Sequence, residues 1–336
     1  CSCVCQPTGC FQKQDTIDTM ARSVAIHSLV LALLSWATLF TVTEAATVYQ
    51  KYANMCNGMP TITRKHDKTL QWLFQNVGEI NIVSKSSPQH EAACWMLRSG
   101  KKFTPQRFVL AVVYYATKGA KWDVNTDWLT SKNECTWYGV ECNSFGKVIN
   151  LDLGYIKVDG LVPREIGLLT ELQDLDLHGN DLQGVIPHKL MTGLKKLEYL
   201  RLQMNGMFGA IHKEIVNMKN LKQLFLYGNY IAGTIPKDLA QLKKLEMIDL
   251  YANQLSGTIP SELAKLPNLK YLDLHDNNLV GTMPKEICDK KLDMLVADCY
   301  GRNPEVKCDC CHICCEGLPK MICVDKKTGN LVNYPF

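Results

Sequence analysis

The middle of the chain repeats one pattern of hydrophobic and polar positions at a nearly constant interval. In each copy leucine or isoleucine occupies the first, fourth and sixth positions, and asparagine occupies the ninth. Five copies fit: LQDLDLHGN from Leu172, LEYLRLQMN from Leu197, LKQLFLYGN from Leu221, LEMIDLYAN from Leu245 and LKYLDLHDN from Leu269. Their starts lie 25, 24, 24 and 24 residues apart, which indicates a structural repeat. With a degenerate copy from Val148 and a truncated one from Leu292, the chain has six full repeats and a partial seventh.

Alternation within each copy predicts a short strand whose leucines point into a core while the intervening residues face solvent. Stacking the copies then builds a parallel sheet along one side. The ninth-position asparagines are expected to satisfy backbone groups of the turns; they are Asn180, Asn205, Asn229, Asn253 and Asn277. The first repeat has Ile156 at this position, and the third has His212 where the other repeats have proline. We expect looser turns at both places.

The segments that follow the asparagines define the type of repeat. LQGVIP, IAGTIP, LSGTIP and LVGTMP fit L-x-G-x-I-P, so residues 105–315 resemble the plant-type leucine-rich repeat family. The resemblance implies an α/β solenoid: a right-handed superhelix with a parallel concave sheet, a helical N-terminal cap region and a disulfide-rich C-terminal cap. It also implies a receptor-like extracellular domain.

The residues before the first repeat predict a cap for the amino end of the stack. Ser87-Pro88 and Thr104-Pro105 are helix start signals, and the second helix is expected to end by Gly119. In that helix Phe108, Val112 and Tyr115 fall on one face, expected to lie against the first repeat. NECTWYGVEC resembles the C-x-W-x-G-V-x-C cap of plant-type repeats, which implies a Cys135–Cys142 disulfide with Trp137 covering the first turn.

Eight cysteines arrive where the leucine pattern fails: Cys288, Cys299, Cys308, Cys310, Cys311, Cys314, Cys315 and Cys323. In CDCCHICC their spacing also permits a zinc site, and His312 offers an imidazole. An oxidising compartment favours disulfides over zinc. Eight cysteines allow 105 pairings, so the bonds themselves stay open. The LVADC segment with CxCCxxCC is similar to the ending of repeat ectodomains of the diatom type.

The compartment depends on residues 20–46, where Arg22 precedes an apolar run and small residues follow at Ala45 and Ala46. This layout is typical of a secretory signal peptide, and a signal anchor is the alternative. The chain opens on CSCVCQPTGC, so it is either a fragment or carries residues upstream of a start at Met20. Both alternatives export the rest of the chain, as a secreted or a single-pass membrane protein. The expected organisation is an uncertain segment 1–19, the export segment 20–46, a poorly defined linker 47–86, the N-terminal cap 87–147, repeats 148–297, the cysteine-rich cap 298–323 and a tail 324–336.

Charge and motifs exclude several classes of function. A net charge of +4 in 336 residues, without a long basic run, argues against nucleic acid as a partner. Phosphate-binding loops, G-x-S-x-G, H-E-x-x-H and the kinase catalytic motifs are all missing from the sequence. We therefore expect no enzyme, no cofactor and no metal, and no kinase after the repeats.

The outward strand positions supply the candidate ligand-binding residues, with an aromatic centre and acidic ends. They are Tyr199, Arg201, Phe225, Tyr227, Met247, Tyr251, Tyr271, Asp176 and Asp249. Aromatic residues, methionine and arginine on a concave sheet have the composition of binding hot spots. The opposing interpretation is that the aspartates, including Asp273, provide solubility and the tyrosines sheet propensity. His178 and His275 are expected to be solvated, or to tune binding with pH.

Three functions are compatible with this sequence. The first is an extracellular recognition module that binds a protein, a peptide or a wall polymer on the concave face, with a membrane co-receptor as a further possible partner. The second is an inhibitor of secreted hydrolases, whose basic surfaces would meet the acidic ends. The third is a metal-binding protein built on residues 308–315.

Overall fold

The computed structural model describes residues 55–56, 67–99, 103–301, 305–316 and 322–332. The chain divides into two compact units, residues 1–68 and 69–336, and the architecture below is that of the second. The predicted export segment 20–46 lies outside the described residues. Within the described ranges, no helix combines the length and the apolar character needed to cross a bilayer.

Among the residues that the structure describes, four α-helices precede the repeats: α2 (Asp67–Asn76), α3 (Glu79–Val83), α4 (Pro88–Arg98) and α5 (Pro105–Ala116). The start signals are confirmed, because the Ser87 hydroxyl accepts the His90 N–H at the start of α4 and Thr104 does the same for Arg107 at α5. Helices α2 and α3 lie in the segment 47–86, where the sequence predicts no element.

Helix α5 differs from its prediction as an amphipathic helix. All residues from Arg107 to Val113 are buried, not only the face that contains Phe108 and Val112. The helix packs against α4 on one side and against the short helix Arg164–Leu168 of the first repeat on another, so it lies inside the cap. Tyr115, on the predicted apolar face, is only partly buried.

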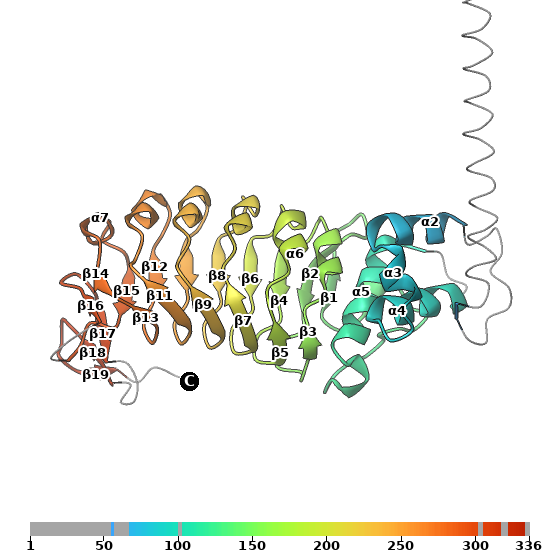
Figure 1. Ribbon diagram of the computed structural model, residues 1–336, viewed down its shortest axis with the longest axis horizontal. Helices are drawn as coiled ribbons and strands as arrows, with labels where there is room; N and C mark the ends of the chain where they lie inside the picture. The colour runs from blue at the N-terminus through green and yellow to red at the C-terminus, as the bar shows by residue number, and fades with distance from the viewer. Residues whose placement is uncertain (1–54, 57–66, 100–102, 302–304, 317–321, 333–336) are drawn as a thin grey trace, which may run out of the picture. The chain divides into compact units, whose positions relative to one another are not determined.

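The L-x-L segments form the predicted parallel sheet, one strand a repeat and side by side along the stack (Figure 1). Its strands are β2 (Val148–Asp152), β4 (Asp174–Asp176), β6 (Tyr199–Arg201), β8 (Gln223–Phe225), β10 (Met247–Asp249), β12 (Tyr271–Asp273) and β15 (Met294–Ala297). Neighbouring strands pair in step, so that Leu175, Leu200 and Leu224 are partners and all are fully buried. These strands correspond to the six full repeats and the partial seventh.

The L-x-G-x-I-P segments form a second parallel sheet, and short helices link each of its strands to the next repeat. We call it the flank sheet; its strands are β3 (Asp159–Leu161), β5 (Asp181–Gly184), β7 (Gly206–Ala210), β9 (Tyr230–Gly233), β11 (Gln254–Gly257) and β13 (Asn278–Leu279). The helices are Arg164–Leu168, α6 (His188–Gly193), Lys213–Asn217, Lys237–Gln241, Ser261–Lys265 and α7 (Lys285–Cys288). The leucine core fills the space between these elements.

The asparagine column has the structural role that was predicted. Asn229 accepts the Met207 N–H at 3.0 Å, and its amide donates to the carbonyls of Leu202 and Leu226 at 3.0 Å each. The same bonding recurs at Asn180, Asn205, Asn253 and Asn277. Each amide thus bonds its own repeat to the preceding one.

The prediction of looser turns is wrong at both places. Ile156 is buried, and its N–H donates to Asn180 Oδ1 at 3.2 Å. His212 has φ −71° and ψ 144°, close to the −66° and 122° of Pro236 in the next repeat. Histidine adopts the extended conformation that proline fixes, so the turn keeps its shape without the ring.

The amino-terminal cap contains the disulfide that the family resemblance implied. Cys135 and Cys142 are bonded, and β1 (Val140–Cys142) pairs antiparallel with β2. Trp137 is 2% exposed and packs against Trp128, with ring centroids 5.2 Å apart. An ion pair of 2.9 Å between the buried Arg107 and Glu134 ties α5 to the same segment.

The carboxyl-terminal cap continues the concave sheet. Strand β17 (Ile313–Glu316) pairs parallel with β15, and β18 (Ile322–Asp325) and β19 (Leu331–Val332) follow antiparallel, while β14 (Gly281–Thr282) pairs with β16 (Val306–Lys307). Residues 324–332 therefore belong to this hairpin, although the sequence predicts a tail there. Asp298 accepts the N–H groups of Asp276 and Asn277 at 2.9 and 3.2 Å, as an asparagine of the column would.

Candidate functional site on the concave sheet

The cap cysteines form disulfides. The bonds are Cys288–Cys310, Cys299–Cys314, Cys308–Cys311 and Cys315–Cys323. Some of their sulfurs gather within 4.8 Å of one another, and one such group includes His275. Metal binding by cysteine needs the thiolate, which a disulfide does not offer. The cluster therefore fastens the end of the stack.

The structure brings the predicted ligand-binding residues together on one face of the concave sheet, but with unequal exposure. Partly buried residues, which present some surface to solvent, are Tyr199, Arg201, Phe225, Tyr227, Met247 and Tyr271. Buried residues are Asp176, Asp249 and Tyr251, with 8%, 7% and 9% exposed. The second group supports the surface more than it contributes to it.

Three seventh-position side chains form a stack across neighbouring repeats, which we call the aromatic ladder. The rings of Tyr227 and Tyr251 are 4.5 Å apart and inclined by 12°, and those of Tyr251 and His275 are 4.8 Å apart and inclined by 9°. Burial raises the pKa of both tyrosine hydroxyls. The prediction of a solvated His275 is wrong, because its side chain is fully buried at the end of the ladder.

Carboxyl groups lie beside the ladder at the fifth position. Asp273 is fully buried, with its Oδ1 2.6 Å from His275 Nδ1. Asp249 Oδ1 has no hydrogen-bond partner among the described residues. Burial, reinforced by the nearby Asp273 charge, raises the pKa of Asp249 to about 8. The expectation that the fifth-position aspartates are solvated is therefore wrong for Asp176, Asp249 and Asp273. Neighbouring side chains on the sheet shield all three from water.

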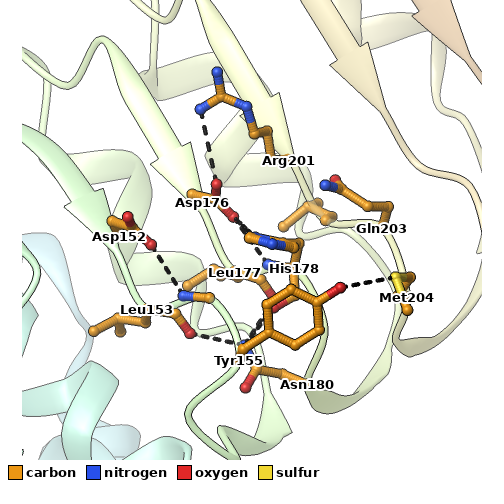
Figure 2. Close-up of polar contacts among 12 residues, drawn as sticks. Asp152, Leu153, Tyr155, Asp176, Leu177, His178, Asn180, Arg201, Gln203 and Met204 are labelled. Atoms are coloured by element: carbon orange, nitrogen blue, oxygen red, sulfur yellow. Dashed lines mark hydrogen bonds and ion pairs between the residues drawn. The ribbon is translucent and has the colours of Figure 1, made fainter. Parts of the chain in front are cut away.

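The amino-terminal end of the face is organised around Arg201 (Figure 2). Its guanidinium contacts both carboxylate oxygens of Asp174, at 2.8 and 2.9 Å, and lies 3.8 Å from Asp176 and 5.0 Å from the Tyr199 ring centroid. Burial raises the pKa of Asp174, against the opposing effect of Arg201. Two carboxyl groups thus share one guanidinium, and the exposed Asp152 adds a third carboxyl on the neighbouring strand β2, so this end is acidic.

Sequence reasoning missed Tyr155 at the same end. Its side chain is 60% exposed, and its ring packs edge-on against His178 with centroids 4.5 Å apart. The Tyr155 hydroxyl donates to Met204 Sδ at 3.3 Å, and His178 Nδ1 bonds Asp176 (Figure 2). Tyr155 occupies the eighth motif position, in a turn with φ 54°, and so lies outside the outward strand positions that supply the sequence candidates. The available signal in the sequence was a tyrosine at a position where two later repeats have glycine, Gly179 and Gly228.

Comparisons with known proteins agree with this architecture. Family models described as "Leucine rich repeat" match residues 195–255 and 219–279, and another match covers residues 171–192. The repeat region is a plant-type leucine-rich repeat stack. The leucine-rich repeat ectodomain of the receptor kinase GASSHO1/SCHENGEN3 from Arabidopsis thaliana, in complex with CASPARIAN STRIP INTEGRITY FACTOR 2, is similar. It is 32% identical, covers 54% of this chain and 22% of its own, and gives a TM-score of 0.50.

Leucine-rich repeat receptors are also the curated relatives of this chain. A probable leucine-rich repeat receptor-like serine/threonine-protein kinase, RPK1 of Arabidopsis thaliana, is 35% identical over 112 residues, which are 26% of this chain and 21% of that protein. Phytosulfokine receptor 1 of the same plant is 36% identical over 89 residues, 25% of this chain and 9% of the receptor. The chain thus spans a small part of each of these proteins.

Proposed function

We propose that the chain is an extracellular recognition module of the receptor-like kind, without catalytic activity of its own, and that its concave face binds an extended peptide segment. The aromatic ladder carries this proposal, because the buried Tyr251 and His275 rings hold Tyr227 in place, and a rigid surface loses little conformational entropy on binding. Tyr227, the partly exposed member of the ladder, presents this surface together with the partly exposed rings of Phe225 and Tyr199. The names of the similar proteins, a phytosulfokine receptor and an ectodomain in complex with a named factor, support the same class.

The spacing of the strands and the charge of the concave face restrict the length and the charge of the ligand. Neighbouring strands lie about 4.8 Å apart, so an extended peptide crossing from β6 to β12 places about four residues on the face. The carboxyl groups around Arg201 outnumber its single charge, so the ligand residue at that end is basic. A membrane co-receptor is a second partner that fits this class of protein.

The experiment is a selection from a displayed peptide library with the full chain as bait. We expect enriched peptides to share a motif of about four residues with Lys or Arg at one end. Phe225→Ala with Tyr227→Ala should abolish their binding while circular dichroism and Tm stay close to wild type. Tyr230→Ala, on the flank sheet, is the matched control and should bind normally. Peptides that bind the double variant as tightly as wild type would refute the concave site.

A further inference from the structure

A hollow of about 540 Å³ opens on the flank sheet, apart from the aromatic ladder. Its lining residues are Asn180, Asp181, Gln183, Met204, Asn205, Gly206, Phe208 and Tyr230. Phe208 is 52% exposed and Tyr230 is 59% exposed, so both rings present large apolar surfaces to water. Exposed aromatic surface of this kind marks a site of interaction.

The two rings are placed by the register of the sheet. Phe208 on β7 and Tyr230 on β9 are partners in a parallel pair, so their side chains stand on the same face about 4.8 Å apart at the backbone. The following strands, β11 and β13, carry no aromatic residue. The aromatic surface is therefore confined to one place on the flank sheet.

Polar groups without partners accompany the rings. The side chains of Asp181 and Gln183 are exposed and make no hydrogen bond or ion pair with the rest of the described chain. A carboxylate accepts hydrogen bonds, and an amide both donates and accepts. The amides of Asn180 and Asn205, by contrast, already donate hydrogen bonds to backbone carbonyls within the asparagine column. The hollow thus combines an apolar platform with two unused polar groups at its rim.

We propose that this hollow binds an uncharged oligosaccharide. The C–H face of a sugar ring packs on Tyr230 and Phe208, and its hydroxyl groups bond Asp181 and Gln183. The volume falls within the ~300–1,000 Å³ of small-ligand sites. A protein partner needs a broader surface, on the order of 1,000 Å², and an aspartate is unfavourable at the centre of such an interface. An acidic sugar is disfavoured because Asp181 is negative and no lysine or arginine lines the hollow.

The experiment is isothermal titration of the full, disulfide-bonded chain with hexamers of β-linked glucose, mannose and xylose, and with an oligogalacturonate of equal length. We expect at least one neutral hexamer to bind, and the oligogalacturonate to bind at least tenfold more weakly. Tyr230→Ala and Phe208→Ala should each weaken the neutral ligand at least tenfold, whereas Tyr230→Phe stays within about threefold. Asp181→Asn should reduce the discrimination against the acidic sugar.

Two variants serve as controls. Val280→Ala removes another exposed apolar side chain of the same flank, and Phe225→Ala alters the concave face; neither should change sugar affinity. Sugar binding that is lost in Phe225→Ala would transfer the saccharide to the concave face and overturn the assignment. Failure of every neutral hexamer to bind would also overturn it. If a cell-surface protein were then captured in a Tyr230-dependent way, the hollow would be a protein-binding site instead. Only the loss in Phe225→Ala bears on the proposed peptide site, because Phe225 belongs to it.

Discussion

Asp249 shows how one buried carboxyl group ties the stability of the stack to pH. Its pKa of about 8 in the folded chain lies above the ordinary 3.8, so the folded state holds a proton that the unfolded chain releases. Between about pH 4 and pH 8 the folded state binds more protons, and the free energy of unfolding falls as pH rises. The protonated form is therefore the one that suits this site.

Asp249→Asn tests this linkage because asparagine has the shape of the protonated acid without its titration. We expect the wild-type Tm to fall between pH 5 and pH 8, and the variant to lose less over the same range. At pH 8 the variant should be the more stable protein. Asp152→Asn, at an exposed carboxyl, is the control. Parallel Tm curves for wild type and Asp249→Asn would contradict the linkage.

A second prediction at the residue scale concerns the asparagine column. Asn229→Ala leaves the Met207 N–H without its partner. It also removes one of the two amide hydrogen bonds that the Leu202 and Leu226 carbonyls each accept, while the bonds from Asn205 and Asn253 remain. The unsatisfied N–H costs about 1–3 kcal/mol and each lost hydrogen bond about 0.5–1.5 kcal/mol, so we expect a loss of at least about 2 kcal/mol in the free energy of urea unfolding. Asn278→Ala is the control: Asn278 follows the column residue Asn277 in β13, its side chain is exposed, and its loss should cost almost nothing. Equal effects of the two substitutions would show that the column is not structural.

At the scale of elements, the strands and their order were predictable, and the details of burial were not. A leucine pattern repeated at constant spacing is compatible with one arrangement of strands, a parallel stack, so the concave sheet and its asparagine column could be predicted from the sequence. The burial of Asp249, Asp273 and His275 depends on which side chains neighbouring repeats place beside them, and the ladder appears only when the repeats are in register. The cap pairing stayed open because 105 arrangements satisfy the same cysteines.

The cap hairpin offers a prediction for an element. The Cys315–Cys323 disulfide joins β17 to β18, and both sulfurs are buried with Val296 and Ile313. Replacing both cysteines with alanine removes a short loop closure, worth about 2.5 kcal/mol. Hydrogen exchange should rise in β18 and β19 and stay unchanged in β6. The matched comparison is the double variant Cys135→Ala, Cys142→Ala, in which we expect exchange to change only in β1. Unchanged protection of β18 in the Cys315→Ala, Cys323→Ala variant would contradict a fastening role.

At the scale of the repeat stack, each copy contacts mainly its neighbours, so a local defect has a local range. Leu224 in β8 is fully buried, and Leu224→Ala should cost about 2–5 kcal/mol through the cavity it leaves. Hydrogen exchange should increase most in β8, less in β6 and β10, and least in β2. Leu161→Ala, at an exposed leucine, is the control. A uniform increase over all strands would indicate one cooperative unit instead.

Five disulfides described in the two caps join cysteines that are close along the chain. The separations are 7, 22, 15, 3 and 8 residues. At a synthesis rate of about 5–20 residues a second, each of these cysteines meets its partner within about four seconds of its own emergence. Oxidation can therefore follow the order of translation, and a repeat that is already stacked never waits for a distant thiol. The end of the stack therefore closes only after the repeats that precede it have emerged and stacked.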